Sequence, residues 1–131
     1  VEDVILYWVP EETHEINKDI SLLMANHGEM IKKNHELIKD LYSLNSGFLS
    51  IVEENGIVKE ISIKPGYLYP LKDTTISSFE PRIYEPGEDV NKDFKVSSTS
   101  FIEIVENELG KFFLVRPIIE YKVNKQIINF L

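Results

Sequence analysis

The sequence contains no cysteine, a single alanine and only two arginines, Arg82 and Arg116. Without cysteine the chain forms no disulfide and offers no thiolate ligand to a metal, which fits a reducing compartment. With so little arginine and a net charge of −8, its surface lacks the cations with which duplex-binding proteins neutralise phosphates. No apolar run reaches the roughly 18 residues of a membrane-spanning helix, so we expect no membrane segment. No basic and then apolar start resembles a signal peptide.

The chain is instead rich in β-branched residues. It has 131 residues, of which 43% are hydrophobic, and 17 isoleucines and 10 valines stand against the one alanine. Branching at Cβ favours the pleated surface of a strand, so the composition predicts an all-β fold and excludes a helical bundle. The length suits one domain or two small ones, and we expect units at residues 1–72 and 73–131 with a break near Leu71–Thr75. Because the first residue is Val1 rather than methionine, we expect a segment of a longer protein.

Alternation of apolar and polar residues predicts many short strands. The clearest pair is Phe48–Ile63, where Asn55-Gly56 provides the two-residue turn of a β-hairpin. Met30–Leu37 only half fits a helical period and is predicted to be non-helical, while Gln126–Leu131 is expected to form a last strand or one helical turn. Further strands are predicted at Val4–Val9, Ile20–Ala25, Glu36–Leu44, Thr74–Phe79, Arg82–Tyr84, Phe94–Val96, Phe101–Val105, Lys111–Val115 and Ile118–Val123.

Glycine turns recur along the chain, and the candidate structural turns are Gly28, Gly47, Gly66 and Gly87. In the first of them Asn34 stands where a glycine would be usual, and both residues tolerate positive φ. This rhythm of glycine turns and short apolar strands resembles the barrel-sandwich hybrid fold of lipoyl and biotinyl carrier domains. Gly66 and Gly87 are therefore predicted to hold positive φ or to approach another segment too closely for a Cβ atom.

A carrier domain displays a lysine at the tip of a hairpin. We expect the interval from Leu37 to Gly47 to be too short for two strands with an exposed lysine between them. Lys39, beside Ile38 and Asp40, is predicted to occupy a strand, so a covalently loaded lysine is not expected. A carrier domain remains one alternative function, and a free-standing interaction domain is another.

Several motifs resemble, in the same order, the β″ subunit family of cyanobacterial and plastid DNA-directed RNA polymerase, the C-terminal part of a split β′. They cover nearly the whole chain and lie at Trp8–Asp19, Ile38–Asp40, Ser46-Gly47, Ile61–Gly66, Tyr84–Val90 and Leu114–Tyr121. The chain departs from the family at Asn34-His35-Glu36, where a glycine-containing turn is usual.

The resemblance implies a non-catalytic insertion of repeated barrel-sandwich hybrid units that interrupts the trigger loop, a mobile element beside the catalytic centre. It implies no cofactor in this segment, since the aspartates that hold the polymerase's magnesium belong to another subunit. The implied partners are other polymerase subunits and an initiation factor such as sigma, with DNA reached only through the assembled enzyme. The implied location is the cytoplasm or the plastid stroma.

No catalytic or metal-binding pattern is evident in the sequence, and we expect none. His14, His27 and His35 lack the spacing of a zinc motif and are expected to be surface residues. The carboxylates near the start are expected to form a solvated acidic face rather than an acid–base pair; they are Glu11, Glu12, Glu15 and Asp19.

The remaining candidates are residues for contact with a protein partner. The aromatic segments 67–71 and 112–114 are expected to be mainly plain core. Tyr67 and Tyr69 share one parity, however, and an exposed tyrosine would be a rigid, amphipathic anchor. Glu103 and Glu106, with Glu108 nearby, are expected to attract a basic protein segment. These residues make protein–protein contact within a polymerase the main functional hypothesis.

Overall fold

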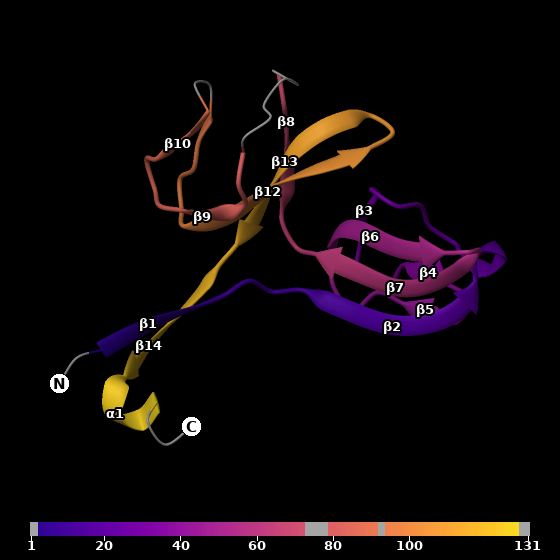
Figure 1. Cartoon of the computed structure of the whole chain (residues 1–131), viewed down its shortest axis with the longest axis horizontal. Helices are drawn as coiled ribbons and strands as arrows, with labels where there is room; N and C mark the ends of the chain where they lie inside the picture. Colours follow the sequence, from indigo (N-terminus) through magenta and orange to yellow (C-terminus); the bar gives the residue numbers. More distant parts are fainter. Residues whose placement is uncertain (1–2, 73–78, 92–93, 129–131) are drawn as a thin grey trace.

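The computed structural model describes residues 3–72, 79–91 and 94–128 of the chain. These residues form fourteen β-strands, one short 3-10 helix and one short α-helix. The all-β prediction is confirmed. The strands make two four-stranded sheets and three two-stranded ones, and Figure 1 shows the two larger sheets as separate bodies joined by crossing segments.

The first unit is built on an antiparallel sheet in the order β2-β7-β6-β3. The β6–β7 hairpin confirms the prediction for Phe48–Ile63, and Asn55 and Gly56 at its turn have φ of 54° and 78°. Isoleucine, leucine and valine from the sheet and the small β4–β5 hairpin fill its core. Its strands are β2 (Glu12–Asp19), β3 (Met30–Ile31), β4 (Glu36–Ile38), β5 (Leu41–Tyr42), β6 (Gly47–Glu54) and β7 (Ile57–Lys64).

The second unit is built on an antiparallel sheet in the order β8-β13-β12-β9, beside a two-stranded β10–β11 sheet. Its core is aromatic: the Tyr69 ring stacks on Phe94 at 4.1 Å between centroids, and Phe113 lies against both Phe79 and Phe94. Its strands are β8 (Tyr67–Pro70), β9 (Arg82–Tyr84), β10 (Asp89–Asn91), β11 (Phe94–Lys95), β12 (Ser100–Asn107) and β13 (Gly110–Pro117).

A third element is the ribbon formed by β1 (Asp3–Trp8) and β14 (Ile119–Asn124), which pair antiparallel over their whole length. It extends away from both larger sheets, and the short helix α1 (Lys125–Ile128) continues from it (Figure 1). The α-helical turn settles the alternatives for the start of Gln126–Leu131; residues 129–131 lie outside the described part of the chain.

Sheet membership changes at Gly66, because β8 pairs with β13 of the second unit. This change precedes the expected break near Leu71–Thr75, and β1 pairs with β14 rather than within the first unit. The division into domains at residues 1–72 and 73–131 stays a prediction. The strand predicted at Thr74–Phe79 falls largely on residues 73–78, which lie outside the described residues.

Near the N-terminus one strand prediction is wrong, and one strand was not predicted. Ile20–Ala25 was expected to be a strand, but Ile20–Leu22 forms the 3-10 helix η1, because the Asp19 carboxylate accepts a 2.9 Å hydrogen bond from the Ser21 amide and caps the turn. Residues 12–19 form β2, which the sequence pattern did not predict because Ile16 is their only aliphatic side chain. Pairing with β7 decides their conformation instead. Met30–Leu37 is non-helical, as predicted.

The candidate turn glycines occupy positions that other residues fit poorly. Gly28, Gly66 and Gly87 have φ of 90°, 155° and 86°, and Asn34 has φ of 67°, as its glycine-like place predicted. A Cβ atom on Gly47 would lie 2.4 Å from the Lys64 carbonyl oxygen, and one on Gly66 2.4 Å from that of Val115. At Gly66 an unusual φ and a close approach of β13 therefore coincide.

Replacing Gly66 with alanine should destabilise the chain more than the same change at Gly87. Gly66→Ala is expected to lower the free energy of unfolding by about 2–4 kcal/mol, because it adds a clash with the β13 backbone to the strain of positive φ. Gly87→Ala, where a Cβ would meet open space, should cost about 1–2 kcal/mol from backbone strain alone. Urea unfolding followed by circular dichroism measures both. Equal losses would contradict the close approach.

Candidate protein-contact surface

The two predicted tyrosines differ in their surroundings. Both lie on the face of β8 that also carries the second unit's core, since Tyr67 pairs with Val115 and Tyr69 with Phe113. Tyr67, at the strand's start, is 52% exposed and remains available to a partner. Tyr69 is only partly exposed, because its ring stacks on Phe94. The structure thus packs Tyr69 against the core, and Tyr67 is the more exposed of the two tyrosines.

The two predicted glutamates point to opposite faces of the second sheet. Positions 103 and 106 of β12 have opposite parity, and the β12–β13 register runs without a bulge. Glu106 is exposed and lies across from Lys111. Glu103 is ion-paired with Lys64 at 3.2 Å and with Arg116 at 3.1 Å, so its charge is compensated inside the molecule. These glutamates do not form one acidic surface, and their role in partner contact stays a prediction.

Arg116 lies where the two units and the segment after β1 meet. Its side chain is 7% exposed, and its guanidinium donates hydrogen bonds to Glu103, to Glu11 and to the carbonyl of Pro10. Lys64 of the first unit joins the same group through Glu103. Alternating charges therefore hold the junction of three segments that are far apart in sequence.

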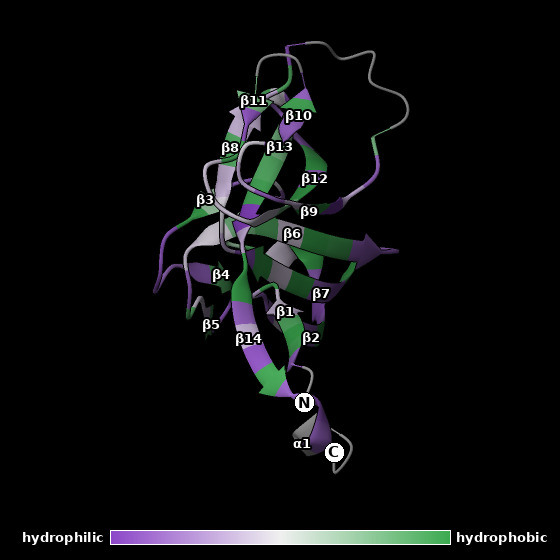
Figure 2. Cartoon of the chain, turned by 90° about the vertical axis from the view of Figure 1, so that its left-hand side faces the viewer, coloured by the Kyte–Doolittle hydropathy of each residue, from purple (hydrophilic) through white to green (hydrophobic). Residues whose placement is uncertain are grey.

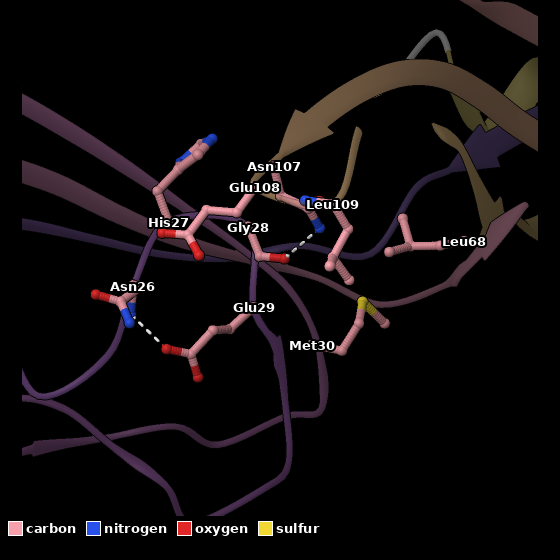
Figure 3. Close-up of a pocket in the computed structure, with 9 residues that line it drawn as sticks. All are labelled: Asn26, His27, Gly28, Glu29, Met30, Leu68, Asn107, Glu108 and Leu109. Carbon is pink, nitrogen blue, oxygen red and sulfur yellow. Dashed lines mark hydrogen bonds between the residues drawn. The ribbon is translucent and has the colours of Figure 1, made fainter. Parts of the chain in front are cut away.

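A groove opens between the first unit's loop 26–30 and the β12–β13 hairpin (Figure 3). Its volume is about 430 Å³. Gly28 forms its floor: its carbonyl accepts a 3.0 Å hydrogen bond from Asn107 Nδ2, and a Cβ atom at Gly28 would collide with the Asn107 side chain. The glycine predicted as a turn is thus also a point of contact between the units.

The groove is apolar with an acidic rim. Met30, Leu68 and Leu109 provide apolar side chains, and Leu109 at the hairpin turn is 87% exposed. Glu29 and Glu108 stand beside them, and Glu29 accepts a hydrogen bond from the Asn26 amide (Figure 3). Such a surface suits an apolar side chain of a partner that is flanked by lysine or arginine.

The one sequence feature that pointed to this groove is an apolar residue, Leu109, in a hairpin turn. Leu109 belongs to Asn107-Glu108-Leu109-Gly110, a tight hairpin connection in which the leucine is 87% exposed. The strands predicted at Phe101–Val105 and Lys111–Val115 implied only a connection at this place. Gly28 and Asn107 are 79 positions apart, so their contact left no local pattern.

The expected acidic face near the N-terminus is partly a structural anchor. Glu12 is 8% exposed and accepts hydrogen bonds from the amides of Leu44 and Asn45 and from the Asn45 side chain, at 2.9–3.0 Å to its Oε1. His14 Nε2 lies at hydrogen-bond distance from the other oxygen. Burial alone would raise the pKa of the Glu12 carboxyl, but these hydrogen bonds outweigh it and hold that pKa below its usual value. Glu12 therefore fixes the loop between β5 and β6 to β2.

Lys39 corrects an expectation. It was predicted to occupy a strand, but Lys39-Asp40 is the two-residue connection of the β4–β5 hairpin, with Asp40 at φ 67°. The interval before Gly47 thus does hold two very short strands with an exposed lysine between them. The turn is tied down, however: the Lys39 amide donates to Leu22, and its carbonyl accepts a 2.8 Å hydrogen bond from Lys18 Nζ.

The described part of the chain was also searched for metal sites and membrane-spanning helices. Across residues 3–72, 79–91 and 94–128, no three His, Asp or Glu side chains gather as a metal site would require. His27 Nδ1 accepts a hydrogen bond from the Ile51 amide, and its ring meets Phe48 edge-on. None of the helices in these ranges is long and apolar enough to cross a membrane.

Comparison with known proteins places the chain in a larger context. It is 39% identical over 126 residues to the DNA-directed RNA polymerase subunit β″ of Rhodomonas salina and 40% identical over 119 residues to that of Porphyra purpurea. It is also 40% identical over 121 residues to subunit β′ of Synechococcus sp. strain CC9902. These matches cover 95%, 90% and 90% of the chain. The chain is homologous to a segment of RNA polymerase subunit β″.

The homology confirms the resemblance drawn from the sequence motifs. No family model matches the chain. The chain spans about a tenth of the length of the curated relatives that it matches, 10% for both algal β″ subunits and 9% for the cyanobacterial β′. The homology therefore relates the chain, as a β″-like segment, to one part of such a subunit, and its role there is a separate question.

Glu12→Gln should destabilise this β″-like segment by about 1–3 kcal/mol at neutral pH, because it weakens the charged acceptor of several buried donors. A carboxyl with a lowered pKa in the folded state stabilises above its unfolded pKa of about 4.3 and loses that contribution as the pH falls through its folded value. The difference between variant and parent should therefore shrink in acid.

Thermal or urea unfolding between pH 7 and pH 3 measures this difference. Glu15→Gln is the matched control, because it removes the same charge from an exposed residue of the same strand. A loss at Glu15 equal to that at Glu12, or a difference at Glu12 that persists unchanged in acid, would contradict the anchoring role.

Proposed function

We propose that this chain is a non-catalytic insertion of a DNA-directed RNA polymerase β″ subunit that acts through protein–protein contacts. The observation that carries the polymerase assignment is the 37–40% identity to β″ and β′ subunits over 90–99% of the chain. In such an enzyme the segment works in the plastid stroma or in the cytoplasm, and its partners include the other polymerase subunits.

The contact role is supported by the groove at the junction of the units. Its apolar lining and acidic rim fit a protein segment that places an apolar side chain beside basic residues. The net charge of −8 attracts such a segment and repels a nucleic-acid backbone, so DNA is reached only through the assembled enzyme. An initiation factor such as sigma is the partner to test first. An insertion in the trigger loop would transmit this binding by shifting the population of loop positions.

Leu109→Asp in the assembled polymerase should leave single-nucleotide addition within about twofold of the parent while changing initiation or pausing several-fold. An aspartate that the partner buries at this position would disrupt an apolar contact in the groove and leave the nucleotide-addition step unaffected. Leu44→Asp is the control, because Leu44 is 65% exposed on the loop between β5 and β6 and does not line the groove.

Promoter-dependent initiation assays and pause assays on a defined template give the readout. Loss of phosphodiester bond formation in an intact assembly would show that the segment has a part in the chemical step. Equal behaviour of Leu109→Asp, Leu44→Asp and the parent would exclude the groove as the contact surface.

A carrier domain is the second candidate, because Lys39 is exposed in a hairpin turn. The backbone of Lys39 forms hydrogen bonds with the Lys18 side chain and with the Leu22 carbonyl. The turn therefore lies against η1 and is not free to enter the active site of a ligase. We therefore expect no mass increase when the chain is co-expressed with a biotin or lipoate protein ligase. Intact-mass spectrometry checks this, with Lys39→Arg as the control. An adduct that the control lacks would establish the carrier function.

A further inference from the structure

The β1–β14 ribbon has one face made entirely of apolar side chains. In an antiparallel pair, residues directly across from each other share a face, and residues two apart along a strand share it too. The register therefore groups three cross-strand pairs on one face: Val4 with Val123, Leu6 with Tyr121, and Trp8 with Ile119. We call these six residues the apolar ribbon face.

The opposite face of the ribbon is mixed. It pairs Asp3 with Asn124, Ile5 with Lys122, and Tyr7 with Glu120. Figure 2 shows hydrophilic and hydrophobic positions along β14, as this alternation requires. A ribbon that separates its side chains in this way has the pattern of a strand pair with one buried side and one solvated side.

The apolar ribbon face is nevertheless uncovered in this chain. Trp8 is 58% exposed, Tyr121 52%, Leu6 45% and Ile119 44%. A two-stranded ribbon without a covering layer is marginally stable in water, and so large an uncovered face marks an interaction site. The covering layer must come from outside the described residues.

We infer that the apolar ribbon face is covered by another segment of the same β″ polypeptide. The matching segment makes up only about a tenth of the related subunits, so some nine tenths of such a polypeptide lies outside it. The ribbon also holds both the first and the last strand described, and Figure 1 marks the N- and C-termini near its outer end. In a related subunit, the residues that adjoin the matching segment would therefore lie near this face.

The size of the face also favours a tethered occupant. It offers six side chains, whereas a stable association of separate proteins uses roughly 20–30 residues on each side. A second copy or a separate subunit bound here alone would be held weakly. A segment of the same chain has an effective concentration in the millimolar range, so the same small apolar area suffices. This inference rests on the homology to a longer subunit and does not depend on the proposed role of the groove.

Photo-crosslinking in the full-length β″ subunit within the assembled polymerase tests the occupant. Tyr121→p-benzoylphenylalanine places the probe on the apolar ribbon face, and Tyr7→p-benzoylphenylalanine places it in the neighbouring pair on the opposite face. We expect the Tyr121 probe to crosslink to β″ peptides outside this segment at a yield at least fivefold above the Tyr7 probe. A crosslink to another subunit or to a second β″ would overturn the inference.

Hydroxyl-radical labelling of the same enzyme keeps the test decisive if crosslinking fails. Trp8 should be oxidised several-fold more slowly than its exposed fraction in this chain predicts, with Tyr7, 42% exposed on the opposite face, as the internal standard. Oxidation of Trp8 in full proportion to its exposure would show that the face is uncovered and would refute the inference, whatever the outcome of the groove variants.

Discussion

The arrangement of the ribbon and the two units depends on the hydrogen bonds and ion pairs of the Arg116 guanidinium. This guanidinium joins β13 to Glu103 of β12 and to Pro10 and Glu11, which link the ribbon to β2. Removing a charge from water costs several kcal/mol, and only well-placed opposite charges and acceptors offset that cost. Here two carboxylates and a carbonyl do so, although Arg116 Nε is buried without a hydrogen-bond partner among the described atoms. The ribbon and both units therefore meet in one defined geometry.

Local structure was predictable where the residues that decide it are adjacent in sequence. Asn55-Gly56 forms a hairpin turn because asparagine and glycine both accept the positive φ that the turn requires. The turn at Asn107–Gly110 likewise ends on a glycine with positive φ. The β4–β5 turn was missed because Lys39-Asp40 contains no glycine; aspartate adopts positive φ there instead. Strand β2 was missed because a polar edge strand acquires its conformation from its neighbour.

The candidate surface was less predictable than the fold, for a physical reason. Parity along a strand tells which residues share a face, but not which face another part of the chain covers. Tyr67 and Tyr69 share a face, yet the aromatic core takes only Tyr69. Glu103 was an acidic surface residue by sequence, and Lys64 and Arg116 compensate it in space. Both facts arise from contacts between residues that are not neighbours in sequence; Glu103 is 39 positions from Lys64 and 13 from Arg116.

The groove and the Arg116 junction act on the same pair of units. Gly28 and Asn107 bring the first unit against the β12–β13 hairpin at the groove. Lys64, Glu103 and Arg116 hold the same two units together at a second place. A partner seated in the groove would therefore bind only the arrangement in which both units are docked, and it would stabilise that arrangement by its differential affinity. Since Arg116 also holds Pro10 and Glu11, the docked arrangement fixes the direction in which the ribbon leaves the units. Binding at the groove would in this way be mechanically linked to the direction of the ribbon.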